Sequence, residues 1–332
     1  MGNKPAISSS ELGTLWMTYQ QKSMIIHMLP YFIKNAGDPE GKELLQSLLV
    51  QVTPYKERIE RIFEEDGAVV PKGFTSQDVN PDAPVLYQPY FDIHFLRLMK
   101  EISMGLHTLH LSMAYREDII TLYRNLSQIT QEFYQHFTQF LLKKGLLPRP
   151  PSVTMPKDVE MAEGTGYMKG NDLFGNKRSL NTVEVAHLYH AIESNVTGMQ
   201  MITGFAQTAK KQEVRDYFNK GKDLSQKIIV EFGQKLTDSD IQVPSTSAGY
   251  PTSSTEGPFT DKLMLYCTSL LCSFGLGSNA IGTAFSLRND LPLKMAALAK
   301  DIYTYGHDGG RIMAKNGWME EPPQMEDRNT LI

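Results

Sequence analysis

The sequence predicts an all-α protein that consists of two four-helix bundles in tandem, related by an approximate two-fold axis. Apolar residues recur every three or four positions in each long segment, and no segment shows the alternation of a strand. The chain also repeats itself: residues 8–71 align with 181–244, and residues 116–151 align with 288–323. A repeat of this length has the size of a domain. We expect one bundle over residues 1–150, a linker over 151–180 and a second bundle over 181–332.

Each copy opens on a predicted helix with a capping signal. Ser8-x-x-Glu11 begins the first copy and Asn181-x-x-Glu184 begins the second. Both fit a capping box, in which the small polar residue caps free N–H groups and the glutamate reaches back. We expect the first of these helices to end near residue 35 and to kink at Pro30.

The second helices are predicted over residues 39–66 and 211–238, from a heptad-like apolar stripe that is clearer in the first copy. Stretches rich in Pro, Gly, Asn, Asp, Ser and Thr follow them, over residues 67–90 and 239–258. These stretches are long for simple loops. In a four-helix bundle they suit the crossover that returns the chain along the bundle.

The third helices are predicted over residues 91–114 and 259–286, and the later one contains Gly275, Gly277 and Gly282. Each glycine inside a helix costs about 1 kcal/mol relative to alanine. Close packing between helices offsets such a cost, or the glycines leave room for a ligand; close packing is the simpler explanation.

The fourth helices follow Arg116-x-Asp118 and Arg288-x-Asp290, where we expect each aspartate to cap the helix. They end at Lys143-Lys-Gly145 and Lys315-Asn-Gly317. Cations in the last turn and a glycine after it are typical of helix C-termini.

Composition excludes several classes of protein. The 332 residues are 41% hydrophobic and 21% charged, which is typical of a globular chain, and the net charge of −4 argues against general nucleic-acid binding. We expect no membrane span and no signal peptide, because no long apolar run appears and the N-terminus is polar. Two cysteines, Cys267 and Cys272, fit a reducing cytoplasm and are expected to be buried core thiols.

Several motifs carry a resemblance to a known family. They include Gly73-Phe74-Thr75-x-x-Asp78-Val79-Asn80-x-x-Ala83-Pro84, Pro258-Phe259-x-Asp261-Lys262-Leu263-Met264 and Asn316-Gly317-Trp318-x-Glu320-Glu321-Pro322-Pro323. The chain resembles a ferritin-like domain family of unknown function from endospore-forming bacilli, often labelled "putative spore coat protein". The resemblance implies two tandem ferritin-like bundles, and it does not imply an enzymatic activity. Relatives with one bundle would pair as homodimers, so we expect the two bundles of this chain to pair with each other.

Ferritin-like bundles often hold two iron or manganese ions, with single glutamates on two helices and Glu-x-x-His on the other two. This pattern is missing from both copies, and the nearest approach on a fourth helix is Glu132-x-x-x-His136. Glu184, His187 and His190 form one Glu-x-x-His with a further histidine, on a first helix. They are the candidates for a single-metal site, although the capping box already explains Glu184. We expect no metal and no catalytic residues.

Three functional hypotheses remain open. The first is a non-catalytic structural or binding protein of sporulating cells, in the mother-cell cytoplasm or the spore coat, with other coat or cell proteins as partners. The second is an unusual iron- or manganese-dependent oxidase or metal-binding protein, which would use Glu184 and His187. The third is a carrier of a small apolar ligand near the glycine-rich third helix.

Overall fold

The computed structural model describes residues 4–170, 178–245 and 248–330. In this part of the chain the long helices are α1 (Ser9–Asn35), α2 (Pro39–Glu65), α3 (Phe91–Ser112), α4 (Glu117–Lys143), α5 (Thr182–Thr208), α6 (Gln212–Thr237), α7 (Asp261–Phe285) and α8 (Asp290–Lys315). The described residues form no strand, only two isolated β-bridges. The all-α prediction is confirmed, and the bounds differ from the predicted ones by a few residues at most.

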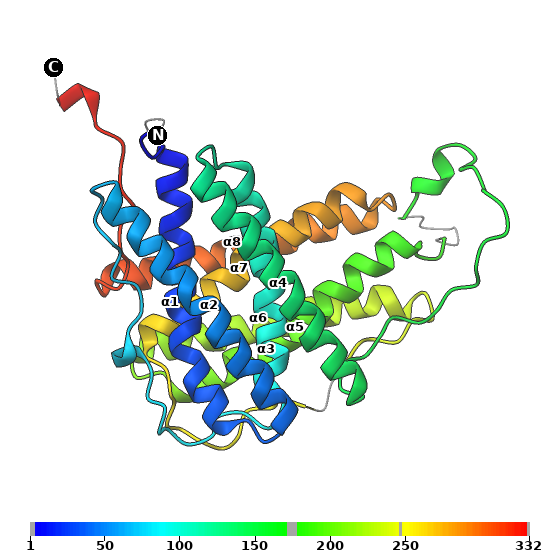
Figure 1. Cartoon of the computed structure of the whole chain (residues 1–332). Helices are drawn as coiled ribbons and strands as arrows, with labels where there is room; N and C mark the ends of the chain where they lie inside the picture. Colours follow the sequence, from blue (N-terminus) through cyan, green and yellow to red (C-terminus); the bar gives the residue numbers. More distant parts are fainter. Residues whose placement is uncertain (1–3, 171–177, 246–247, 331–332) are drawn as a thin grey trace.

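The helices associate in antiparallel pairs, α1 with α2, α3 with α4, α5 with α6 and α7 with α8. Further contacts join the pairs into two groups of four, α1–α4 and α5–α8. The first group stands upright in Figure 1 and the second group runs across it. The two predicted bundles are therefore present, packed at a steep angle.

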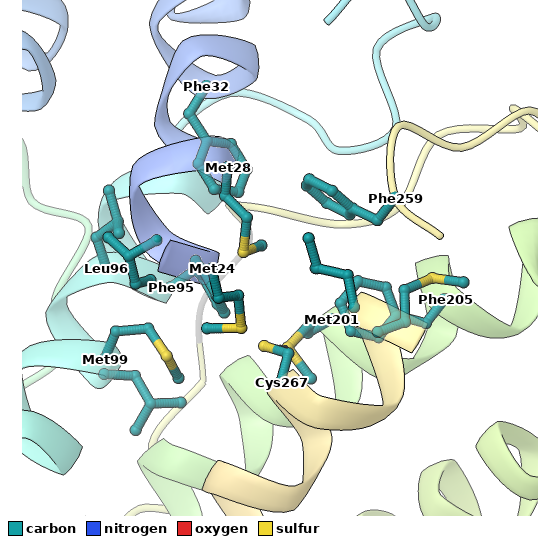
Figure 2. Close-up of a cluster of buried hydrophobic side chains, with 14 of the residues drawn as sticks. Met24, Met28, Phe32, Phe95, Leu96, Met99, Met201, Phe205, Phe259 and Cys267 are labelled. Carbon is teal, nitrogen blue, oxygen red and sulfur yellow. Dashed lines mark hydrogen bonds between the residues drawn. The ribbon is translucent and has the colours of Figure 1, made fainter. Parts of the chain in front are cut away.

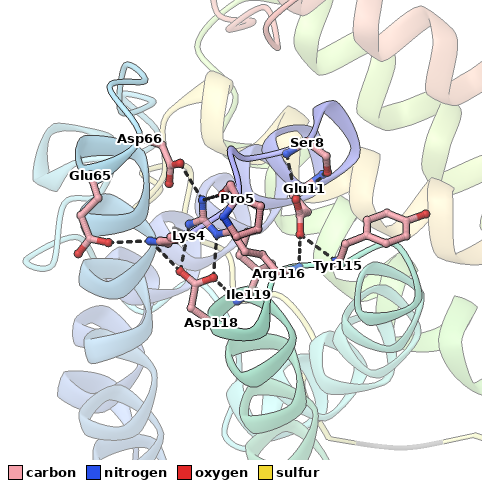
Figure 3. A network of polar contacts seen from close by, with 10 residues as sticks. All are labelled: Lys4, Pro5, Ser8, Glu11, Glu65, Asp66, Tyr115, Arg116, Asp118 and Ile119. Atoms are coloured by element: carbon pink, nitrogen blue, oxygen red, sulfur yellow. Dashed lines mark hydrogen bonds and ion pairs between the residues drawn. The ribbon is translucent and has the colours of Figure 1, made fainter. Parts of the chain in front are cut away.

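Both predicted capping boxes are present. Glu11 and Glu184 accept hydrogen bonds from the backbone N–H of Ser8 and Asn181, at 2.9 and 3.0 Å. The second carboxylate oxygen of Glu11 accepts from the N–H groups of Tyr115 and Arg116 (Figure 3). The capping box therefore also ties the start of the first helix to the start of the fourth.

The predicted caps of the fourth helices are wrong. Arg116 and Asn289 occupy the N-cap positions and make no side-chain cap hydrogen bond. Asp118 and Asp290 lie in the first turn instead, 2.8 Å from the guanidinium Nε of the arginine two residues before each of them. There each carboxylate satisfies a buried arginine and also interacts favourably with the helix dipole.

The two crossovers pair with each other by symmetry-related bridges. Val79 pairs with Phe259, and Tyr87 pairs with Pro251. At the offset of 172 that relates residues 116–151 to 288–323, Val79 corresponds to Pro251 and Tyr87 to Phe259, so exchanging the copies turns one bridge into the other. This reciprocal pairing is what the two-fold relation expected from the repeat would produce.

The two bundles share an apolar core. Figure 2 shows methionine and phenylalanine side chains of α1 and α3 facing a group from the second bundle, which consists of Met201 and Phe205 of α5, Cys267 of α7, and Phe259 just before α7. The ring of Phe259 lies 6.0 Å from that of Phe32 and 6.1 Å from that of Phe205, so it packs between the bundles. Cys267 is buried in this core, Cys272 is half-buried, and both are free thiols. One continuous core therefore holds both bundles together.

One described helix, α7, is long and apolar enough to cross a membrane, by length and composition alone. Here it packs along α8 and against α5 within the second bundle. This finding is weak evidence for a membrane span, because the core helix of a bundle has the same composition.

Candidate functional site

Glu184, the first sequence-predicted candidate, is fully buried and committed to structural contacts. Arg178 donates to both of its carboxylate oxygens, at 2.7 and 2.8 Å, and the N–H of Arg288 donates to one of them at 2.9 Å. Burial alone would raise the pKa of Glu184, but these hydrogen bonds outweigh it and lower the pKa. The carboxylate oxygens of Glu184 are therefore occupied by hydrogen bonds that hold the end of the second bundle together.

His187 and His190 have other partners. The His187 ring stacks on Phe285. The Nε2 of His190 lies 3.0 Å from the carboxylate of Glu101, on α3 of the other bundle. Burial opposes a charge on His190, but the hydrogen bond to Glu101 raises its pKa overall. The structure thus does not gather Glu184, His187 and His190 into one ligand set.

The centre of the first bundle holds buried polar side chains that sequence analysis did not single out as a group. The Nζ of Lys22 lies 3.0 Å from Nε2 of His107, and Nδ1 of His107 lies 3.1 Å from the Thr130 hydroxyl. One turn along, the Thr18 hydroxyl lies 3.1 Å from Nδ1 of His110. Three helices, α1, α3 and α4, therefore meet through a chain of hydrogen bonds.

Burial makes these groups poor proton acceptors. It lowers the pKa of Lys22 well below its usual value, with help from the charge of Lys100, and lowers that of Lys100 to about 8. It also lowers the pKa of His110 to about 4 and that of His107 far below its usual value. Uncharged histidines and weakly basic lysines can stay in an apolar interior at a lower cost.

The centre of the second bundle is a small cavity at the corresponding place. Its volume is about 80 Å³. In the internal alignment Gln21, Lys22, Lys100, Ser103 and Thr130 of the first centre correspond to Ser194, Asn195, Cys272, Gly275 and Ile302, which line this cavity. Gly198, where the first copy has Ile25, lines it too. The first copy fills its centre with large side chains, and the second leaves it partly open.

Neither centre fits a dinuclear iron or manganese site. None of the groups just named at the first centre is a carboxylate, and Lys100, which is charged below its pKa of about 8, would repel a divalent cation. The second centre also has no carboxylate in its lining: its potential donors are the Asn195 amide, the Cys272 thiol, whose pKa burial raises, and the hydroxyls of Ser194, Ser225, Thr268 and Tyr305. Hard cations prefer carboxylate oxygens, and dinuclear sites take several. Among the described residues no three His, Cys, Asp or Glu side chains gather to hold a metal ion.

The sequence contains a pattern that indicates buried polar side chains at the first centre. His107 and His110 are three residues apart on the third helix, and Lys22 and Lys100 interrupt the apolar faces of two core helices. What the sequence does not give is the packing of helices that brings His107 against Lys22.

A family model described as "Protein of unknown function (DUF3231)" matches residues 1–159 and, a second time, residues 168–331. The chain belongs to this family. It contains two DUF3231 units in tandem, and the gap between the matches lies inside the predicted linker. The family resemblance inferred from the motifs is confirmed.

One solved structure is similar to part of this two-unit DUF3231 chain: a "putative spore coat protein" from Bacillus halodurans C-125. It is 15% identical and has a TM-score of 0.43, and the match covers 45% of this chain and 98% of that one. No curated protein matches the chain. A likeness of this degree carries no argument about function.

Proposed function

We propose that this protein is a non-catalytic structural or binding protein of sporulating cells, built from two fused ferritin-like bundles. The observation that carries the proposal is the centre of the first bundle. There the Lys22–His107–Thr130 chain occupies the space where a bundle enzyme would place its metal ligands. The link to sporulation rests on the resemblance of the crossover and C-terminal motifs to a family often given a spore coat label.

Elemental analysis tests the non-catalytic part. The tag-free protein is purified after growth with added iron and manganese, and its metals are measured by plasma mass spectrometry. We expect well under one metal ion per chain. Near-stoichiometric iron or manganese that is lost on Glu184→Gln or His187→Gln would instead support a metal-dependent role.

Cell fractionation tests the cellular role. We expect the protein to appear late in sporulation, in the mother cell, and to be recovered in coat extracts. Equal amounts in growing cells, with none in coat extracts, would contradict the proposed place.

The cavity of the second bundle supports a second candidate function, the carrier of a small apolar ligand. At about 80 Å³ it is smaller than the cavity of roughly 150 Å³ that binds benzene in an engineered protein. A ligand of a few heavy atoms fits it, whereas an elongated one requires the helices to separate. Native mass spectrometry of the purified protein would show a co-purified ligand as added mass.

The double variant Gly198→Ala/Gly275→Ala is a matched test of the carrier function. Added methyl groups would approach Leu271 and Ile302 no closer than 3.4 and 3.7 Å, which is ordinary contact, so the bundle should fold. Both would reduce the cavity. A ligand mass that disappears in this variant supports the carrier function, and one that persists unchanged contradicts it.

A further inference from the structure

A cavity outside both bundle centres lies in a groove between α2 and α4, at the end of the first bundle where α1 begins. Its volume is about 630 Å³, within the range of roughly 300–1,000 Å³ that is typical of small-molecule sites. Tyr55 and Arg58 of α2 line one side, and Thr121, Leu122 and Asn125 of α4 line the other. Tyr115, an exposed aromatic residue, stands at the rim.

A network of ion pairs fixes the end of this groove (Figure 3). Arg116 is paired with Asp66 at 2.7 Å and with Asp118 at 2.8 Å. Lys4 is paired with Glu65 at 2.9 Å and with Asp118 at 3.0 Å. These two cations are therefore paired with three carboxylates, and their positions are held.

Arg58 differs from the other cations of the groove. It is half-buried, and in the described part of the chain it makes no hydrogen bond or ion pair, although its charge acts from a distance on Glu65. A guanidinium carries several donors in a planar fork that matches a carboxylate. Glu117 also lines the groove, but its side chain is exposed at the rim, where water screens its charge.

The second bundle has an ion pair at the corresponding place. In the internal alignment Arg58 corresponds to Glu231 and Leu122 to Lys294, and these two residues are paired at 3.0 Å. In the second bundle, side chains of the two helices thus form an ion pair across the position that the groove occupies in the first bundle. The open groove with a free arginine is a property of the first copy, and the fold does not require it.

We propose that this groove binds a small planar carboxylic acid. The carboxylate pairs with Arg58, the ring packs against Tyr55, Leu122 and Tyr115, and Thr121 and Asn125 supply polar contacts at its edge. This site is separate from both bundle centres, so the inference does not depend on the function proposed above.

Isothermal titration with 2-naphthoate tests the proposal, with the neutral 2-naphthalenemethanol as the matched probe. We expect the full-length protein to bind 2-naphthoate roughly tenfold more tightly than the alcohol, which is the effect of one charge-assisted hydrogen bond. Failure of the wild-type protein to bind 2-naphthoate at millimolar concentration would overturn the proposal.

The variant Arg58→Glu/Leu122→Lys transfers the ion pair of the second bundle into the groove. We expect it to lose at least about tenfold in affinity for 2-naphthoate. Arg61→Gln is the control, since Arg61 is an exposed residue of the same helix outside the groove lining and its substitution changes the net charge by the same one unit. Unchanged affinity in the folded double variant, or an equal loss in the control, would overturn the proposal.

Arg58→Gln keeps the result interpretable if the double variant does not fold. It leaves the shape of the groove nearly unchanged and removes only the charge. The preference for 2-naphthoate over the alcohol should then disappear, and a preference that persists contradicts the assigned role of Arg58.

Discussion

Tyr305 of α8 lies directly over Gly221 of α6, so that a Cβ atom at position 221 would clash with the tyrosine hydroxyl and ring. The reciprocal contact occurs one turn away, where the Tyr217 ring covers Gly309 and stacks on Tyr305 with ring centres 4.2 Å apart. In the internal alignment, the first copy has Leu48 with Phe133 and Leu44 with Phe137 at these positions. Where the second copy places a tyrosine against a glycine, the first copy has two large apolar residues.

Gly221→Ala should therefore destabilise the protein by about 1–3 kcal/mol, because it overpacks a close helix contact. Adding Tyr305→Leu should recover most of this loss, since the shorter side chain makes room. Gly277→Ala is the control: it lies in α7 with no atom within 4 Å of the added Cβ, and should be neutral or stabilising by up to about 1 kcal/mol. Urea unfolding measures all three variants, and equal effects at positions 221 and 277 would contradict this account.

Lys100→Met should stabilise the protein at neutral pH. Lys100 is only 2% exposed and burial lowers its pKa to about 8, against about 10.4 in an unfolded chain. A base whose pKa is lowered by folding destabilises the protein by the full amount at a pH below its folded-state pKa. The destabilisation vanishes as the pH rises above the unfolded-state pKa. The corresponding residue of the second copy, Cys272, carries no such charge.

The expected gain from Lys100→Met is about 1–3 kcal/mol at pH 7 and falls below about 1 kcal/mol at pH 10. Guanidinium unfolding at pH 7 and pH 10 measures the difference between variant and wild type. A gain that is the same at both pH values would indicate packing rather than the relief of a buried charge.

Acid should destabilise the first bundle through His110. Its pKa is about 4 in the folded protein and about 6.5 when unfolded, so the unfolded state binds the proton first. The contribution of neutral His110 to the free energy of unfolding is fully retained above pH 6.5. It is lost as the pH falls from 6.5 towards 4, by up to about 3 kcal/mol. His110→Gln should show a flatter dependence than wild type over this range. Parallel pH profiles of the two proteins would show that His110 does not titrate as described.

The sequence predicts the fold more completely than the site. Helix bounds follow from local signals such as Ser8 with Glu11 and the glycines at positions 145 and 317, which adopt positive φ values of 68° and 67°. The tandem arrangement follows from the repeat. These features depend on residues that are close in sequence or related by the repeat.

The bundle centres are harder to predict because they depend on which faces of distant helices meet. Lys22 and His107 are 85 residues apart, and the position of each on its own helix does not say which side chain of a distant helix it meets. Glu184 shows the opposite case: its local role as a capping residue is visible in the sequence, but its bonds to Arg178 and Arg288 come from tertiary structure. A Glu-x-x-His spacing alone therefore overstates the evidence for a metal.

The two bundles should remain associated after the linker between them is cut. Residues 152–160 are exposed and can accept an inserted protease site. After cleavage we expect both halves to elute together in gel filtration at micromolar concentration, because the apolar core around Phe259 is continuous between the bundles.

Phe259→Asp places a charge in that core and should release the halves. Phe285→Asp is the control, since its side chain is 61% exposed, and it should leave the cleaved protein intact. Halves that separate without any substitution would show that the linker, and not the shared core, holds the bundles together.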